Sequence, residues 1–555
     1  MVGTGITSGC GVDLVYSEDP DAGAYRGPNV ATPAAVPSDA ADDEVREVGG
    51  TKVDASVEPT DGGGSEAGAD TGGDVVLPTA TSDAALDVSD AEVFEASADA
   101  AVDAAVEAGV PPGPVFVYQH FDINHVLSTG QSNAVTNGGT PVLSNTQPFG
   151  NLSFNTGVMP MSSCNGNVCR VYQTPSGFKP LVEGDQFFGY GVETLSSGMA
   201  NQITQLAMDR YLPAGPRHDV LVTLHGRSGN AYPCLRKGGC AWFNEPQLRP
   251  FDQAMMEVKD AKALAAALGK TYVVRAVTVI HGESDHYSPG NFPLNGTDGA
   301  PNALKNYADG LMEWQRDYEA GVKAITGQSE AVPLFLVQMH GWVGDASTNK
   351  SVIPANQLDA HVRAPGKVVL VAPEYPVEFK YQDSIHLSNA AGRRLGEYFA
   401  KAYASVVMAG KAWEPLRPAE IVRNGPVIDV TFVVPVPPLV LDVVNVTNPG
   451  NYGFNFTDNS GATPAIASVV LTGASSVRVT LAQAPSDTAV KYLSYAHIRN
   501  TGPTRGGPTT GARGNLRDSD PTPTRYAAYP AQGDSPPTPN LPLYNWGVTF
   551  NQLLP

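Results

Sequence analysis

Long apolar stretches, cysteines and surplus positive charge are all scarce in the 555-residue sequence. No run of about 18 uninterrupted apolar residues exists, which predicts that no helix spans a membrane. Lys and Arg number 35 against 56 Asp and Glu, a formal net charge of −21. Because proteins that bind nucleic acid usually carry a basic surface, no nucleic-acid partner is expected.

The negative charge is concentrated at the N-terminal end. Residues 1–112 contain 23 acidic and 3 basic residues, so the rest of the chain is almost neutral at −1. This segment has only Tyr16, Tyr25 and Phe94 as aromatics, too little apolar surface to offset the entropy of ordering. Its like charges also repel one another. We therefore expect residues 1–112 to form a disordered, acidic spacer.

One of the five cysteines lies in this spacer. Cys10 follows the residues ITSG, which faintly resemble the site where bacterial lipoproteins are cleaved and lipidated. No basic start and no apolar core of normal length precede it. Cys10 is therefore either a lipid anchor behind a shortened signal or an ordinary cysteine in a flexible tail.

The other four cysteines form two close pairs, Cys164 with Cys169 and Cys234 with Cys240. Two local disulfides are the simplest pairing, and they suit an oxidising compartment. A metal site is the rival interpretation, but His ligands at zinc-like spacing are missing nearby. The pairs therefore favour an extracellular or cell-envelope location.

Strand-like and helix-like segments alternate after the spacer, which predicts a parallel sheet covered by helices. The predicted strands are short and rich in Val, Ile and Leu: 124–129, 219–224, 273–280, 333–339 and 367–372. The predicted helices are 190–208, 251–268, 303–325, 351–362 and 389–407. The expected fold class is therefore α/β.

The pattern changes after Trp413. Short strands are predicted at 427–434, 468–471, 476–481 and 489–496, separated by Asn, Gly, Pro and Ser. We expect a small antiparallel, sandwich-like β-domain over 413–500. Residues 501–555 are rich in Pro, Gly, Thr and Arg and are expected to be irregular, attached to the body by Tyr544, Trp546 and Phe550.

Polar, Gly-rich residues follow each predicted strand of the parallel sheet, where open α/β sheets bind their ligands. They are GQSN at 130–133, HGRSGN at 225–230, HGESD at 281–285, HGW at 340–342 and DSIH at 383–386. Ser132 lies in a turn after the first strand, while Asp383 and His386 are three residues apart. A serine nucleophile needs a base and a group that orients the base, so these three form a candidate triad.

An oxyanion formed by attack of the serine needs preorganised donors. The backbone N–H groups of Ser132 and of Gly226 or Gly229 are the candidates. Each motif alone has a simpler explanation, because GQSN can be a plain turn and D-x-x-H can be a helix cap beside an exposed histidine. The order of the motifs along the chain favours catalysis.

That order resembles the SGNH (GDSL-like) hydrolases, and GQSN, HGESD and DSIH most resemble their sialate O-acetylesterase and carbohydrate-esterase branch. The resemblance covers about 124–408, inside an expected esterase domain at 113–412. It implies a three-layer flavodoxin-like fold, no cofactor and removal of acetyl groups from sugars. By motif match, Ser132 is the nucleophile, His386 the base and Asp383 its orienter.

One position departs from this branch, which usually has Gln where the chain has His281. A neutral histidine still donates one hydrogen bond, so we expect His281 at the oxyanion hole or substrate. Other expected substrate-binding residues are Gln131, Asn133, Glu283 and His340. Glu283 and Asp285 could instead order their loop, or form the acid pair of a glycosidase.

The sequence therefore predicts a serine esterase that deacetylates carbohydrate through an acetyl-serine intermediate. Two alternatives stay open. One is a carbohydrate-binding or adhesion protein on a hydrolase scaffold, suggested by the β-domain and the spacer. The other is a lipase or thioesterase of the same superfamily. The sequence leaves the oligomeric state and the particular glycan open.

Overall fold

The structure is a computed structural model that describes residues 116–161, 171–187, 190–240, 249–340, 351–380, 385–498, 506–526 and 541–554. The chain divides into two units, Met1–Gly113 and Pro114–Pro555, and all described residues belong to the second. The expected disordered spacer with Cys10, the pair Cys164 and Cys169, and Asp383 lie outside the described residues.

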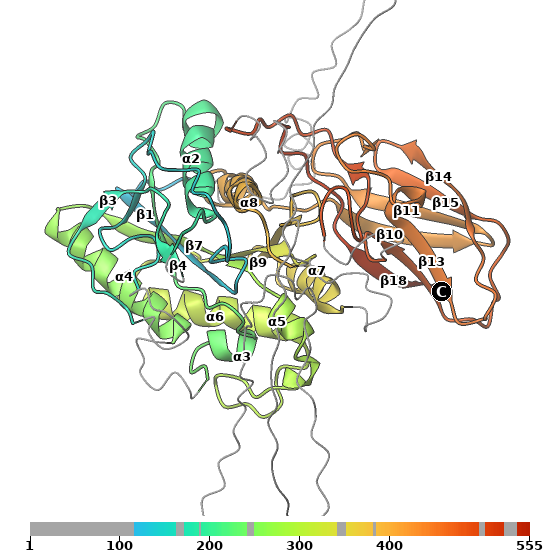
Figure 1. Ribbon diagram of the computed structural model, residues 1–555, viewed down its shortest axis with the longest axis horizontal. Helices are drawn as coiled ribbons and strands as arrows, with labels where there is room; N and C mark the ends of the chain where they lie inside the picture. The colour runs from blue at the N-terminus through green and yellow to red at the C-terminus, as the bar shows by residue number, and fades with distance from the viewer. Residues whose placement is uncertain are drawn as a thin grey trace, which may run out of the picture. The chain divides into compact units, whose positions relative to one another are not determined.

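The five predicted strands are neighbours in one seven-stranded sheet, and the last of them along the chain forms one edge (Figure 1). They are β1 (Ile123–Gly130), β6 (Val220–Leu224), β7 (Tyr272–Ile280), β8 (Leu334–Gln338) and β9 (Val368–Pro373). Their order is β6-β1-β7-β8-β9 and every neighbouring pair is parallel. The strands are almost wholly buried because helices cover both faces, which explains their near-continuous apolar sequences.

Two further strands at the β6 edge were not predicted. The strand β2 (Leu152–Phe154) pairs parallel to β6, and β3 (Phe178–Pro180) pairs antiparallel to β2. Each has only three residues, too few for an alternating pattern to be visible in the sequence.

Helices lie on both faces of the sheet, as predicted (Figure 1). On one face α2 (Ser196–Leu206) packs against α8 (Asn389–Tyr403), and each continues into a π-helical turn, Ala207–Tyr211 and Ala404–Met408 respectively. The other face carries α4 (Pro250–Ala267), α6 (Tyr307–Thr326) and α7 (Ile353–Arg363). Short helical segments are α3 (Tyr232–Leu235), α5 (Glu283–His286) and two 3₁₀ turns, Pro289–Asn291 and Asn451–Gly453.

Helix α2 begins six residues later than the predicted start at residue 190. Residues Tyr190–Gly191 form β5, which pairs with β4 (Gln186–Phe187). The carboxylate of Glu183 then accepts hydrogen bonds from the backbone N–H groups of Thr194 and Ser197, at 3.1 and 2.9 Å. These donors have no partner within the helix, so the carboxylate satisfies them where α2 begins.

The C-terminal part is β-rich, and its two larger sheets are antiparallel (Figure 1). One has the order β10-β11-β15-β14: β10 (Arg417–Asn424), β11 (Val427–Val433), β15 (Ser476–Leu481) and β14 (Ile466–Gly473). The other has the order β13-β16-β18: β13 (Phe454–Asp458), β16 (Lys491–Tyr495) and β18 (Phe550–Leu554). The predicted β-rich C-terminal architecture is confirmed.

The end of the chain is more regular than predicted. Strand β18 completes a sheet, and Leu516–Arg517 forms β17, paired with β12 (Val440–Leu441). Phe550 packs against the rings of Phe454 and Tyr495, with centroids 6.4 and 5.8 Å away. The aromatic cluster therefore packs inside the β-rich part, while Trp546 lies 6.4 Å from the Tyr375 ring of the α/β body.

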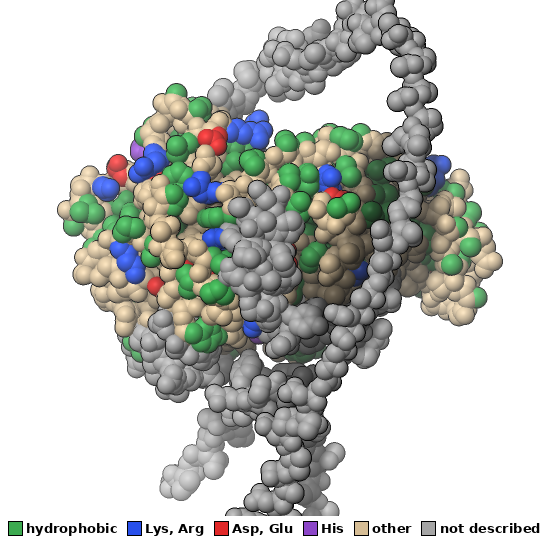
Figure 2. Space-filling view, turned by 45° about the horizontal axis from the view of Figure 1, so that its top comes forward, with side chains coloured by type: hydrophobic (Ala, Val, Ile, Leu, Met, Phe, Trp, Pro, Cys, Tyr) green, Lys and Arg blue, Asp and Glu red, His purple; other side chains and the backbone are tan. Residues whose placement is uncertain are grey.

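No helix in the described part of the chain is long and apolar enough to cross a membrane. The visible face in Figure 2 mixes cationic, anionic and apolar side chains without a dominant charged patch. This matches the near-neutral composition of the sequence beyond residue 112.

Candidate functional site

Ser132 follows β1 at the edge of the sheet where the parallel strands end. The preceding Gly130 has φ +132°, and a Cβ there would lie 2.1 Å from the carbonyl oxygen of Ile280, so only glycine fits. The Gln131 N–H donates to the same carbonyl at 3.1 Å, fixing the turn against β7. Ser132 is 5% exposed. The turn thus presents Ser132 at the predicted ligand-binding edge.

Asn133 connects the serine turn to the loop that carries His386. Its Nδ2 donates to the carbonyl oxygen of Ile385 at 3.0 Å, and its Oδ1 accepts from the N–H of Leu387 at 3.0 Å. Both residues that flank His386 are therefore fixed to the neighbour of Ser132. One buried side chain, adjacent to Ser132 in the sequence, therefore links the serine turn to the backbone on both sides of His386.

The same Nδ2 donates a second hydrogen bond, to Glu283 Oε1 at 2.9 Å. Asn133 is 1% exposed and its amide is fully used within the protein. The predicted substrate-binding role of Asn133 is therefore not supported, and the residue positions the three loops instead. Gln131 also contacts the loop of Glu283, because its Oε1 accepts from the N–H of Ser284 at 2.9 Å.

The loop of His386 has its own anchors. The His386 carbonyl oxygen accepts from the N–H of Lys380 at 2.9 Å, and Phe379 forms a β-bridge with Leu387. Ser388 then caps α8, its Oγ accepting from the N–H of Ala391 at 3.1 Å. His386 is 8% exposed. Its backbone is thus fixed on both sides, whereas its predicted partner Asp383 lies outside the described residues.

Gly226 is the better placed of the two candidate oxyanion glycines. It is buried against the serine turn, where a Cβ would lie 2.8 Å from the carbonyl oxygen of Gly130. The next residue, Arg227, donates its N–H to that carbonyl at 2.9 Å. Gly229 is exposed and has φ +70°. Within the described ranges, the N–H groups of Ser132 and Gly226 have no hydrogen-bond partner, so both can donate to a ligand.

A buried polar network below the sheet supports the Gly226 loop. His225 Nδ1 lies 3.0 Å from Glu257 Oε2 on α4, and its Nε2 lies 2.7 Å from the Tyr318 hydroxyl on α6. Arg227 donates to Gln253 Oε1 at 2.7 Å, and Gln253 in turn donates to Glu257 Oε1 at 2.9 Å. Two helices therefore fix the residues on each side of Gly226.

The sequence reasoning did not find Gln253 and Glu257. The feature of the sequence that could have revealed them is their spacing: two polar residues four positions apart lie on one face of a helix, here the buried face of α4. A buried carboxylate needs partners, so such a pair points to a network inside the fold.

His281 does not have the geometry of an oxyanion donor. Its Nε2 lies 3.0 Å from the carbonyl oxygen of Asn230, which can only accept, so this nitrogen carries the proton. Its Nδ1 lies 2.7 Å from the Tyr307 hydroxyl and accepts from it. Burial lowers the pKa of His281 to about 4, so the ring is neutral. Both nitrogens are used, and the predicted oxyanion role of His281 gives way to positioning of Asn230.

Two buried carboxyl groups, Glu283 and Glu374, interact with each other, and Glu283 also interacts with His386. Burial raises the pKa of Glu283, and the hydrogen bond from Asn133 and the charge of His386 partly oppose this. Burial and the negative charge of Glu283 raise the pKa of Glu374 well above its ordinary value. Glu283 Oε2 is buried without a hydrogen-bond partner among the described residues. The buried Glu283 carboxyl therefore interacts electrostatically with His386.

His340 is covered by the C-terminal part of the chain. Its Nε2 contacts the carbonyl oxygen of Ala512, its Nδ1 lies 3.4 Å from Thr549 Oγ1, and its ring lies 5.2 Å from Tyr375. Only 1% of His340 is exposed. Its predicted substrate-binding role is not supported, because the sequence could not show that residues 512 and 549 pack on this loop.

Two further predictions concern cysteines and metals. Cys234 and Cys240 form the predicted disulfide, with Cα atoms 4.5 Å apart. In the part of the chain that the structure describes, no group of three or more His, Cys, Asp or Glu side chains could hold a metal ion.

No protein-family model and no curated protein sequence matches the chain. Among solved structures, a carbohydrate acetylesterase from Xanthomonas citri is similar over 77% of this chain and 80% of its own, with 13% identity and a TM-score of 0.44. A carbohydrate acetylesterase from Sinorhizobium meliloti (12% identity, TM-score 0.27) and the inhibitor-bound aryl esterase of M. smegmatis (11%, 0.27) each match 51% of this chain and 99% of their own.

These similarities are distant, so the roles of individual residues rest on the geometry above.

Proposed function

We propose that the protein is a serine esterase that removes acetyl groups from O-acetylated carbohydrate. The observation that carries the proposal is the Asn133 amide, whose bonds to Ile385 and Leu387 bring the backbone of His386 against the turn of Ser132. A hydroxyl and an imidazole placed together at the carboxyl edge of a parallel sheet are the minimum for nucleophilic ester cleavage.

In the proposed mechanism the Ser132 hydroxyl attacks the ester carbonyl carbon, and His386 accepts the hydroxyl proton. The oxyanion is stabilised by the N–H groups of Ser132 and Gly226. The C–O bond to the sugar then breaks, and the sugar oxygen takes the proton from His386. Water, deprotonated by His386, attacks the acetyl-serine and releases acetate and the free Ser132 hydroxyl.

The acidic partners of His386 complete the proposal. Asp383 is assigned by its place in DSIH as the group that orients the imidazole. The Glu283 carboxyl, whose pKa is raised by burial, interacts electrostatically with His386 and accepts a hydrogen bond from the Asn133 amide. One amide therefore positions both the backbone around His386 and a carboxyl that interacts with the imidazole.

Location and ligand class are part of the same proposal. The disulfide Cys234–Cys240 supports export to an oxidising compartment, and Cys10 remains a candidate lipid attachment site. Carbohydrate is proposed because GQSN, HGESD and DSIH resemble the carbohydrate-esterase branch, and no cofactor is required by the mechanism.

The test is turnover of p-nitrophenyl acetate by the full chain, with Ser132→Ala as the control. Loss of turnover in Ser132→Ala supports the proposal. Equal rates in the variant and the unmodified chain would instead favour a non-catalytic binding protein. Comparing acetyl with long-acyl esters separates an acetylesterase from a lipase or thioesterase. Acetate release from acetylated xylan, pectin, peptidoglycan and sialosides then identifies the glycan.

A further inference from the structure

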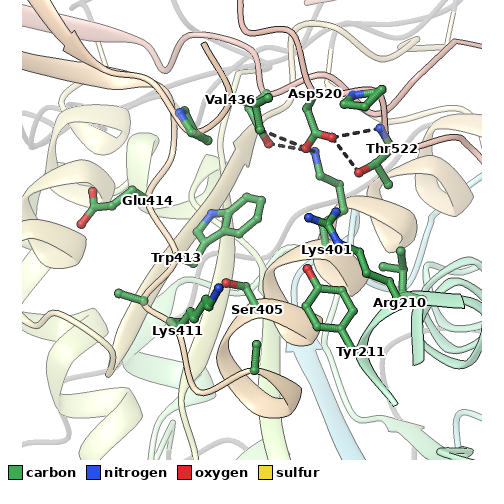
Figure 3. Close-up of a pocket in the computed structure, with 16 residues that line it drawn as sticks. Arg210, Tyr211, Lys401, Ser405, Lys411, Trp413, Glu414, Val436, Asp520 and Thr522 are labelled. Atoms are coloured by element: carbon green, nitrogen blue, oxygen red, sulfur yellow. Dashed lines mark hydrogen bonds and ion pairs between the residues drawn. The ribbon is translucent and has the colours of Figure 1, made fainter. Parts of the chain in front are cut away.

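A pocket of about 650 Å³ lies where the π-helical ends of α2 and α8 meet the β-rich part of the chain (Figure 3). Its volume is in the range of about 300–1,000 Å³ that is usual for small-molecule sites. Arg210 and Tyr211 come from the end of α2, while Lys411 and Trp413 come from the segment after α8. π-Helical turns often occur at functional sites, and here two of them border one pocket.

The residues that line the pocket carry more positive than negative charge. Lys401 is buried and paired with Asp520 at 2.9 Å, and Glu414 is paired with Arg417 at 2.7 Å. The remaining cations are Arg210 and Lys411, both exposed, and no carboxylate of the described residues pairs with either. The pocket therefore offers two positive charges to a ligand.

Two aromatic side chains give the pocket apolar surfaces, as Figure 3 shows. The Trp413 ring is fixed by a hydrogen bond from its Nε1 to the carbonyl oxygen of Leu370, at 3.1 Å. The Tyr211 ring lies with the Arg210 guanidinium 5.5 Å from its centroid. Flat aromatic rings pack against the C–H faces of sugar rings, so Trp413 and Tyr211 suit a pyranose ligand.

We infer that this pocket binds an acidic sugar of the uronate class, with its carboxylate between Arg210 and Lys411 and its ring against Trp413 and Tyr211. The side chains supply both halves of such a ligand, charge for the carboxylate and aromatic surface for the pyranose. The inference goes beyond the proposed esterase activity and does not depend on it.

The pocket lies at the opposite edge of the sheet from Ser132. Helix α8 follows β9 and runs back along the sheet, so its end reaches the edge where the strands begin. His218, just before β6, confirms this placement because its Nε2 lies 2.8 Å from the Tyr403 hydroxyl in the last turn of α8. Binding here would anchor a polysaccharide without occupying the catalytic edge.

The test is calorimetric titration of the full chain with a trimer of galacturonic acid, the neutral galactose trimer, and inorganic phosphate. We expect the acid trimer to bind, and the double variant Arg210→Gln/Lys411→Gln to weaken binding by about tenfold or more. The matched control Lys259→Gln/Lys270→Gln removes the same charge from exposed positions on and after α4 and should bind as the unmodified chain does.

The outcomes are separable. Absence of binding to the acid trimer, equal weakening in both double variants, or phosphate binding as tight as the trimer would each overturn the inference. Turnover of p-nitrophenyl acetate and the thermal unfolding midpoint should be unchanged in Arg210→Gln/Lys411→Gln. If the chain binds the trimer but turns over no ester, the esterase proposal fails while this one stands.

Discussion

The sharpest prediction concerns Asn133, whose amide makes three buried hydrogen bonds. Asn133→Ala leaves a carboxyl oxygen, a carbonyl oxygen and an N–H without partners. Each unsatisfied buried group costs about 1–3 kcal/mol, so we expect the free energy of unfolding to fall by at least about 3 kcal/mol. Release of the His386 backbone should also shift the imidazole, and a displacement of about 1 Å can cost roughly 100-fold in rate.

The assay is kcat/KM for p-nitrophenyl acetate at a temperature where the variant stays folded. The matched control is Asn124→Ala at the other end of β1. Asn124 is fully buried, and its amide also makes three hydrogen bonds, to Phe121, Asp219 and Arg275, at 3.0, 3.2 and 2.8 Å. The Asn124→Ala variant should lose a similar amount of stability and keep the kcat/KM of the unmodified chain, because Asn124 lies at the far end of β1 from Ser132.

A second variant distinguishes loss of His386 positioning from a general loss of stability. Asn133→Asp keeps an acceptor for the Leu387 N–H but replaces the donor to Glu283 by a second carboxyl. Its activity should recover in part when acid protonates one of the two carboxyls. If Asn133→Ala is as destabilised as Asn124→Ala yet retains full kcat/KM, the amide does not position the base and the reasoning is refuted.

Four further predictions follow from the structure and sequence. Glu257→Gln should lower stability by about 1–3 kcal/mol and lower kcat more than it raises KM, since the Gly226 loop loses its support; unchanged kcat would contradict this. Burial raises the pKa of Asp285 to about 7, so the folded chain binds the extra proton between about pH 4 and 7 and its stability falls as pH rises through that window. Denaturant unfolding at several pH values should show that Asp285→Asn removes this pH dependence of the free energy of unfolding. An unchanged pH dependence in the variant would contradict the assignment to Asp285. Replacing Cys234 and Cys240 together by Ser should cost about 2 kcal/mol, because a six-residue separation closes a short loop, and a reductant should have no effect on that variant's unfolding midpoint. Deleting residues 1–110 should leave ester turnover unchanged, and a large loss would show that the acidic segment is more than a spacer.

The sheet and its helices could be predicted because their signals are local. Five buried strands with continuous Val, Ile and Leu, each followed by a helical pattern, define a parallel sheet before any contact is known. The same order placed Ser132 and His386 at one edge, and the Asn133 bonds agree with that placement. Short strands such as β2 and the late strand β18 escaped, because their pairing depends on distant partners.

The roles of individual polar residues were harder to predict because tertiary contacts decide them. Asn133 and His281 look like ligand-binding residues in sequence, yet buried neighbours use all of their bonding groups. His340 is covered by Ala512, which lies 172 positions along the chain. A polar side chain in a motif can equally serve the substrate or the protein, and only the structure distinguishes the two.

The central claim is that Ser132 is a nucleophile activated by His386. A fluorophosphonate probe, followed by peptide mass mapping of the full chain, tests it most directly. We expect a single phosphonylated residue, Ser132, with labelling strongly reduced in His386→Ala and retained in Asn124→Ala. Labelling of another serine, or equal labelling of Ser132 with and without His386, would contradict it.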